Sequence, residues 1–532
     1  MNVVSASAGR RRAGLLVPLF SFPSSASWGI GEIADVAPMT KWLGGAGQRA
    51  LQLLPINEMA TGDWSPYSAQ SAMAIDPIFI RVASLPEFAA LGGEAALDAE
   101  DRRDLDQARR AARVDHVTVR RLKERALAAA FDRFLETDWR SGTDRARSLE
   151  AFEADESWWL ADYALFRALH ERENHRAWTE WPEALRRRDP PALDQARREL
   201  AREVRFRTYL QWIAATEWQT ARASARAHGV ALLGDLPFMV DANSADVWAR
   251  QDEFYLDRSV GVPPDAFSAT GQDWGMPAYR WDVVAAGGFK WLRDRARRSA
   301  ALYDGFRVDH LVGFYRTYSR PRTGGSPAFE PPVEADQLAL GEQTLGALRD
   351  SGAEIIAEDL GVVPDFVRTS LARLGIPGFK VFRWERHWDT GDHAFRDPAA
   401  YPALSVATSG THDTEPMITW WEHAPAEERA AVAAVPTLRS VAPGVDVASA
   451  PYGAVRDALL ETLFASASEL LLLPVQDVFG WRDRINVPAT VSPDNWTFRL
   501  PWPCDLMDES AEARERQTTL RTWAARHGRE SL

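Results

Sequence analysis

The chain has 532 residues, beyond the ~250–300 at which a single hydrophobic core usually stops growing, so one large domain with insertions or two to three domains are expected. With 46% hydrophobic and 26% charged residues, it has a globular rather than a disordered composition. The formal net charge of −13 argues against a phosphate-binding surface, so we expect no nucleic-acid partner. Cys504 is the only cysteine, which excludes an intramolecular disulfide bond and fits a cytoplasmic location.

The N-terminal segment has three arginines, Arg10–Arg12, before the apolar run AGLLVPLF (13–20), a combination that resembles a twin-arginine secretion signal. The run has only eight residues, however, and the following SFPSSASWG offers no convincing cleavage site. A first strand of the mature fold explains the run better. No run approaches the ~20 apolar residues that a membrane helix needs, so we expect no membrane segment.

Eight short segments with turn or helix signals on both sides are predicted to be strands. They cover residues 49–56, 74–80, 230–240, 305–311, 353–360, 378–384, 404–413 and 470–480. Most of the segments between them are long enough to hold a helix. Strands that alternate with helices pair in parallel, so the sequence predicts an α/β fold of the (β/α)₈ TIM-barrel class.

Two intervals are too long for one crossover helix. Residues 84–228 have helical spacing and predict a helical insertion after the second strand. Residues 241–303 contain GVPPDAFSATGQDWGMPAYRW (261–281), which has neither a helical nor an alternating pattern and predicts an ordered loop at the barrel mouth. The segment 319–335 is rich in Gly and Pro and has the composition of a lid. We expect residues 1–532 to form one catalytic barrel domain with these insertions.

Acidic residues fall at the ends of four predicted strands. Asp309, Glu358 and Asp413 end the fourth, fifth and seventh strands, and Asp235 lies late in the third. The carboxyl ends of the strands meet at the catalytic face of a (β/α)₈ barrel. Carboxylates there are costly to desolvate unless they take part in chemistry or are paired.

Arg307 and Asp309 share one face of their strand, because side chains alternate with period two. A guanidinium beside a carboxylate lowers the pKa of that carboxylate and holds it ionised, as a covalent nucleophile requires. The same pair could instead only stabilise the barrel, and this segment alone does not separate the two interpretations. His310 lies on the opposite face, for which we expect a structural role.

Glu358 follows an apolar run, where a carboxylic acid keeps its proton to a higher pH and can donate it. Alternatively, Glu358 and Asp359 only open the next helix, and His412 and Asp413 only cap one. Three acids and an arginine at three strand ends are more specific together. They match retaining glycosidic chemistry, in which two carboxyl groups ~5–5.5 Å apart act as nucleophile and acid/base.

Other chemistries have less support. No H-E-x-x-H, C-x-x-C, EF-hand or G-x-x-x-x-G-K-[ST] motif is present, so neither a metal nor a nucleotide is expected. The 22 tryptophans suit sugar stacking, although most tryptophans anchor cores.

Six motifs occur together in one order along the chain. They are GDLPFMV (234–240), PPDAFSATGQDWGMPAYRW (263–281), GFRVDH (305–310), IIAEDLG (355–361), SGTHD (409–413) and NVPATVSPDNW (486–496). This set resembles the amylomaltases, the 4-α-glucanotransferases of glycoside hydrolase family 77, which are relatives of the α-amylases. The resemblance covers about residues 14–505, and the long loop motif is its most specific part.

The resemblance implies roles for the strand-end residues. Asp309 would be the nucleophile, and Glu358 the acid that protonates the leaving 4-OH and then acts as base. Asp413 with His412 would hold the hydroxyls of the sugar in the donor subsite next to the scissile bond. Arg307 would orient and ionise Asp309.

Five further residues receive roles from the same resemblance. Tyr67 would stack on that sugar, Asp265 and Trp274 would line and cover the groove, Asn486 would lie near the donor subsites, and Asp235 would support the nucleophile region. The implied reaction passes a segment of an α-1,4-glucan or maltooligosaccharide to the 4-OH of another glucan or of glucose, without cofactor or metal.

This sequence departs from the family pattern at Ala489, where glycine is usual, and in the residues after Asp413. These departures bear on acceptor preference and not on the core chemistry. Two alternatives remain: a relative that mainly hydrolyses or uses an unusual acceptor, and a glucan-binding protein without activity. The complete set of acids argues against the second.

Overall fold

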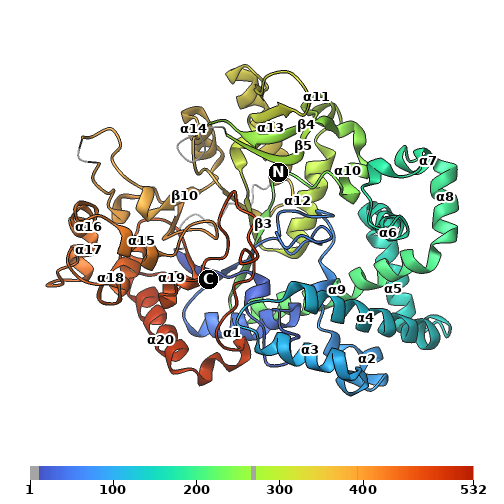
Figure 1. The fold of residues 1–532 in the computed structure, drawn as a ribbon. Coiled ribbons are helices and arrows are strands. Elements are labelled where there is room, and N and C mark those ends of the chain that lie inside the picture. Colours follow the sequence, from blue (N-terminus) through green and yellow to red (C-terminus); the bar gives the residue numbers. More distant parts are fainter. Residues whose placement is uncertain (1–10, 265–270, 392, 531–532) are drawn as a thin grey trace.

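The computed structural model describes residues 11–264, 271–391 and 393–530 (Figure 1). Eight parallel strands form a closed barrel in the order β1-β12-β11-β10-β9-β6-β3-β2. They are β1 (Arg12–Leu16), β2 (Ala50–Gln52), β3 (Ala231–Leu236), β6 (Gly305–Val308), β9 (Glu354–Ala357), β10 (Gly378–Val381), β11 (Ser405–Thr408) and β12 (Leu470–Pro474). The predicted (β/α)₈ barrel is confirmed.

One predicted strand, residues 74–80, is wrong. Pro77–Phe79 form a 3-10 helix, and the Asp76 side chain caps it by accepting the Ile78 N–H at 2.9 Å. Pro77 has no N–H for a strand ladder, and the Asp76 carboxylate satisfies the backbone instead. The eighth barrel position belongs to β1, which the N-terminal apolar run forms between β12 and β2.

The barrel interior is filled by aliphatic side chains and one phenylalanine from alternate strand positions. All are buried: Ala50, Leu233, Ile356, Phe379, Val406, Leu470 and Leu472. Each large one contributes about 1.5–3 kcal/mol of hydrophobic stabilisation. The residues between them point outward and pack against the surrounding helices, so the short strands are buried on both faces.

Residues between β2 and β3 fold into a helical layer, which lies at the right and lower right of Figure 1. Side-chain caps from Asp98, Asp115 and Thr143 begin three of its helices. The helices are α2 (Pro86–Ala90), α3 (Ala99–Arg110), α4 (His116–Phe134), α5 (Asp144–Asp155), α6 (Ser157–Arg172), α7 (Glu183–Arg186), α8 (Pro190–Glu199) and α9 (Ala201–Ala227).

A second, antiparallel sheet lies beside the barrel at the top of Figure 1, with the order β5-β4-β7-β8. Its strands are β4 (Phe254–Val262), β5 (Gln272–Tyr279), β7 (Thr317–Pro321) and β8 (Ala328–Glu330). The loop predicted over 261–281 and the lid predicted over 319–335 therefore both contribute strands. Register shifts between β4 and β5 disrupt the alternating pattern that would have revealed them. Gly261 also lets the β5 backbone approach closely, because a Cβ there would lie 2.0 Å from the Gln272 carbonyl oxygen.

The remaining helices surround the barrel. They are α1 (Val36–Gly45), α10 (Ala245–Ala249), α11 (Trp281–Ala286), α12 (Lys290–Leu302), α13 (Glu334–Arg349), α14 (Asp365–Leu374), α15 (Met417–His423), α16 (Ala426–Ala433), α17 (Pro436–Val441), α18 (Tyr452–Phe464), α19 (Val475–Phe479) and α20 (Ala511–Arg526). Among the described residues, no helix combines the length and apolarity needed to cross a membrane.

The C-terminal residues close the floor of the barrel. Arg529 is fully buried and donates to the carbonyls of Phe464, Ser466 and Arg12. Glu530 forms a bridge with Arg12 at the start of β1. Both ends of the described chain therefore meet at the amino ends of the strands, opposite their carboxyl ends.

Candidate active site

Arg307 lies at the centre of a cluster of carboxylates at the carboxyl edge of the barrel. It is 4% exposed and pairs in register with Asp235 of β3. Its Nη1 bonds to Asp235, and its Nη2 lies 3.0 Å from Asp309 Oδ1 and 3.2 Å from Glu358 Oε2. Three of the four strand-end acids predicted from the sequence, Asp235, Asp309 and Glu358, are thus brought together by one buried guanidinium.

The separation of Asp309 and Glu358 can be bounded from these contacts. Both carboxylate oxygens contact the same nitrogen, so they lie no further apart than the sum of the two distances, about 6 Å. Retaining enzymes place their carboxyl groups ~5–5.5 Å apart, whereas inverting enzymes need ~6.5–9.5 Å to admit a water molecule. The arrangement fits the retaining spacing.

The prediction that Arg307 holds the pKa of Asp309 low is wrong. Burial raises the pKa of Asp309 to about 7; Arg307 opposes this rise, and the negative charges of Glu358 and Asp235 add to it. The prediction considered the neighbouring cation, but neither the burial of Asp309 nor the two other acids that share Arg307. Asp309 therefore titrates near neutral pH.

Glu358 is held by the backbone of the fourth-strand loop. Its Oε2 accepts the His310 N–H at 2.5 Å, and its own N–H donates to the Val308 carbonyl at 3.1 Å. His310 itself has a left-handed φ of +41°. The alternative that Glu358 opens a helix is wrong, since α14 begins only at Asp365.

The His310 ring contacts aromatic rings on both sides, Phe238 at 5.6 Å and Trp274 at 4.7 Å between centroids. Burial lowers the pKa of His310 to about 4, so the ring is neutral. Its ring packing agrees with the structural role expected for it. The backbone bond to Glu358 was missed, because sequence does not show where an N–H points.

Asp413, His412 and Asn486 form a second polar group. Asn486 Nδ2 donates to Asp413 Oδ1 at 2.7 Å, and His412 Nε2 lies 3.4 Å from Asp413 Oδ2. Burial alone would raise the pKa of Asp413, but His412 and the Asn486 bond outweigh it and bring it well below its usual range. The alternative that Asp413 caps a helix is wrong: α15 begins at Met417, whose N–H is bound by Asp477.

Tyr67 joins the two groups. Its hydroxyl donates to Asp235 Oδ2 at 2.7 Å, and its ring stacks on His412 with 5.3 Å between centroids. Trp274 lies on β5, where it packs on His310. Asp265, predicted to line the groove, lies outside the described residues.

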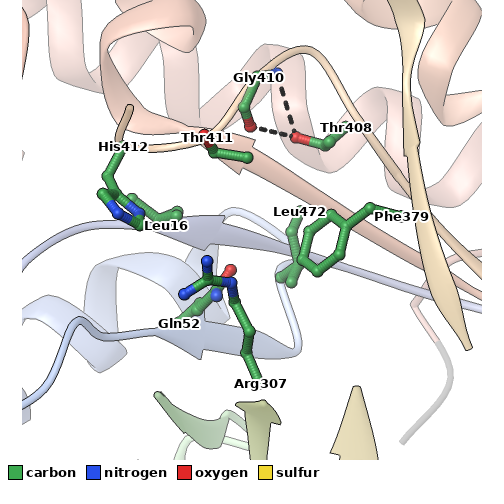
Figure 2. A pocket seen from close by; sticks show the side chains of 9 residues that line it. All are labelled: Leu16, Gln52, Arg307, Phe379, Thr408, Gly410, Thr411, His412 and Leu472. Atoms are coloured by element: carbon green, nitrogen blue, oxygen red, sulfur yellow. Dashed lines mark hydrogen bonds between the residues drawn. The ribbon is translucent and has the colours of Figure 1, made fainter. Parts of the chain in front are cut away.

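A small cavity lies inside the barrel beneath this cluster (Figure 2). Its volume of about 10 Å³ is room for roughly one water molecule. Gln52 is 1% exposed there, and its Oε1 has no hydrogen-bond partner among the described residues. Gln52, Arg307 and His412 all line this cavity (Figure 2).

No group of three or more His, Cys, Asp or Glu side chains suited to a metal occurs within residues 11–264, 271–391 and 393–530. The positive charge that faces the acids is that of Arg307. A parallel (β/α)₈ barrel with two acids near the retaining spacing and a buried arginine at its carboxyl edge fits the class of glycoside-processing barrel enzymes.

Comparisons with known proteins narrow this class. A family model described as 4-alpha-glucanotransferase, of glycoside hydrolase family 77, matches residues 17–505. The chain is 34% identical to the 4-alpha-glucanotransferase of Thermus thermophilus, covering 95% of this chain and 99% of that one. It is 30% identical to the enzyme of Chlamydia pneumoniae, covering 92% and 91%.

The amylomaltase of Streptococcus agalactiae in complex with acarbose superposes with a TM-score of 0.82 at 26% identity, covering 98% of this chain and 100% of the other. The chain belongs to the 4-alpha-glucanotransferase family. The family and the transferase class predicted from the sequence are confirmed.

Proposed function

We propose that this chain transfers segments of α-1,4-glucans by a retaining double displacement. The observation that supports the mechanism is the contact of Asp309 and Glu358 with one nitrogen of Arg307, which keeps the two oxygens within about 6 Å and so agrees with the retaining spacing. The Asp309 carboxylate attacks the anomeric carbon while the glycosidic C–O bond breaks, and Glu358 gives its proton to the leaving 4-oxygen. The acceptor 4-OH then loses its proton to Glu358, and its oxygen displaces Asp309.

The surrounding residues support the two steps. Arg307 stabilises the ionised form of Asp309 and is itself fixed by Asp235 and Tyr67. Asp413, ionised and held by Asn486, presents carboxylate oxygens that accept bonds from sugar hydroxyls. These roles follow from charge and position, and they agree with the roles that the family resemblance implies.

Transfer rather than hydrolysis requires that water be kept from the glycosyl enzyme. Trp274 on β5 brings the antiparallel sheet against His310, the residue after the nucleophile, and so supplies cover at the mouth. Substrates are α-1,4-glucans and maltooligosaccharides, with glucose also an acceptor, and acarbose in the Streptococcus agalactiae relative supports a glucan site. We place the activity in the cytoplasm, without nucleic acid, cofactor or metal.

Incubation with maltotriose tests the proposal. Transfer gives glucose together with a ladder of longer maltooligosaccharides, whereas only glucose and maltose would identify a hydrolase. Asp309→Asn should abolish turnover and keep maltotriose binding by calorimetry. Asp162→Asn, a surface carboxylate paired with Arg188, serves as the control and should keep full activity. Full activity of Asp309→Asn would overturn the assignment.

A further inference from the structure

The barrel ladder is sparse beside Glu358. β9 pairs with β6 over four residues, but it pairs with β10 at one position only, Ala357 opposite Gly378. Pro377, just before β10, has no N–H with which to extend the ladder. The backbone that carries Glu358 leaves β9 at this point, so it lacks strand pairing on its β10 side.

The side chain of Asp359 supplies a link across this gap. Its Oδ1 accepts the Phe379 N–H of β10 at 2.7 Å, and the residue is 8% exposed. On the other side, the Glu358 N–H donates to the Val308 carbonyl of β6. Glu358 therefore lies between two anchors, one made by its own backbone and one by its neighbour's carboxylate.

Gly378 is shaped to this carboxylate. A Cβ at Gly378 would lie 2.5–2.6 Å from the carboxyl atoms of Asp359, closer than real Cβ contacts allow. The φ of Gly378 is not left-handed, so any residue could adopt its backbone conformation. The position needs glycine because the Asp359 carboxylate lies against it.

We propose that Asp359 is a positioning residue: by joining the end of β9 to β10 across Gly378, it holds the Glu358 carboxyl group where a glycosidic oxygen can receive its proton. The inference rests on the acid/base role proposed for Glu358. The carboxylate of Asp359 points into the seam between the strands and acts on the reaction only through Glu358.

Three single variants and one double variant test the link. Asp359→Ala should lower kcat for maltotriose disproportionation about 10–100-fold with KM changed less than about twofold, because misplacement by ~1 Å costs up to ~100-fold. Asp359→Asn keeps the acceptor oxygen and should stay within about threefold of the parent. Gly378→Ala should lose as much as Asp359→Ala, since its Cβ displaces the carboxylate.

The double variant combines Asp359→Ala with Gly378→Ala, so that the added Cβ occupies the space that the carboxylate has left. Its kcat should be less than about twofold below that of Asp359→Ala alone, because the two substitutions remove the same contact and their effects are not additive. If the kcat losses of the two single variants multiply in the double variant, the link between Asp359 and Gly378 is wrong. Thermal unfolding of each variant identifies any loss that comes from folding.

A donor whose leaving group needs no proton distinguishes the positioning of Glu358 from a wider structural role of Asp359 in the active site. With α-maltosyl fluoride, first-turnover fluoride release by Asp359→Ala and by Glu358→Gln should stay within about threefold of the parent, while both lose maltotriose turnover. Equal losses of Asp359→Ala with both donors, while Glu358→Gln keeps fluoride release, would overturn the inference alone. Loss of fluoride release in Glu358→Gln would overturn the acid/base assignment and the inference with it.

Discussion

At Asp309, burial and one guanidinium act in opposite directions, and burial dominates. Because the pKa of Asp309 is raised to about 7, kcat/KM should fall about tenfold per unit as the pH falls below that value. The carboxyl binds its proton more tightly in the native than in the unfolded chain. Its contribution to the free energy of unfolding therefore decreases as the pH rises from about 4 to 7.

Removing the like charge at Glu358 should lower the pKa of Asp309. In Glu358→Gln, the acid limb of first-turnover fluoride release from α-maltosyl fluoride should move to lower pH than in the parent. Glu354→Gln is the matched control, since Glu354 lies on the same strand and pairs with Arg12 at the opposite end of the barrel. An acid limb unchanged in Glu358→Gln would contradict the shared charge.

Ala489, a departure from the family pattern, has the left-handed φ of +57°. This conformation costs a residue with a Cβ roughly 1 kcal/mol, and glycine adopts it freely. Ala489→Gly should therefore raise the free energy of unfolding by up to about 1 kcal/mol. Ala111→Gly, at an ordinary φ of −62°, should lower it by about 0.5–1 kcal/mol. Equal losses in both variants by urea unfolding would contradict the strain.

At the scale of elements, the helical layer holds the segment that carries Tyr67. Three helices reach this segment, which runs over residues 57–76. α4 contributes Arg120 to Asp76, α6 contributes Arg167 to Glu58 at 3.0 Å, and α9 contributes Gln211, which bonds the backbone of Ile75. The layer thus fixes a loop whose Tyr67 hydroxyl reaches the Arg307 cluster.

Arg120→Met should be strongly destabilising. Asp76 is fully buried, and without Arg120 its carboxylate lies unpaired, a loss of about 3–5 kcal/mol. Burial would raise the pKa of Asp76, but Arg120 and two backbone N–H groups lower it in the parent. The difference in the free energy of unfolding between Arg120→Met and the parent should therefore shrink as the pH falls below about 4. Tyr67 loses support as well, so transfer activity should fall.

Arg121→Met is the control on the same helix. Arg121 is 35% exposed, and its buried partner Asp101 keeps Arg125 when Arg121 is removed. Its removal should therefore change the free energy of unfolding by less than about 1 kcal/mol. Urea unfolding measures both variants. Similarly small losses of unfolding free energy in both variants would show that the pair of Arg120 and Asp76 does not stabilise the helical layer.

The strand-end acids could be found from sequence because parallel barrel strands gather their carboxyl ends whatever the loops do. Once the strands that end at Asp309 and Glu358 are assigned correctly, it follows that the two acids lie at the same edge of the barrel. Two features could not be found. The antiparallel sheet is obscured by its register shifts and glycines, and the bonds of His310 and Asp359 depend on backbone directions that residue types do not specify.

At the scale of the whole molecule, Arg529 fastens the C-terminal segment to the barrel floor. Arg529→Met leaves buried carbonyls at Phe464 and Ser466 with fewer donors, which should lower the free energy of unfolding by about 2–3 kcal/mol. Transfer activity at 25 °C should stay at the parent level, because this floor lies opposite the carboxylate cluster. Arg526→Met, an exposed neighbour paired with Glu461, should change Tm by less than about 2 °C. A Tm for Arg529→Met as high as that of the control would contradict the fastening.

The placement of β1 between β2 and β12 has a consequence for synthesis on the ribosome. β1 can pair with β2 as soon as both have emerged, but its other neighbour follows about 450 residues later. At ~5–20 residues per second, the nascent barrel exposes that edge of β1 for roughly 20 to 90 seconds. An open parallel edge invites pairing with other chains. The edge of β1 that finally pairs with β12 is therefore the barrel edge that stays open to aggregation for the longest time during synthesis.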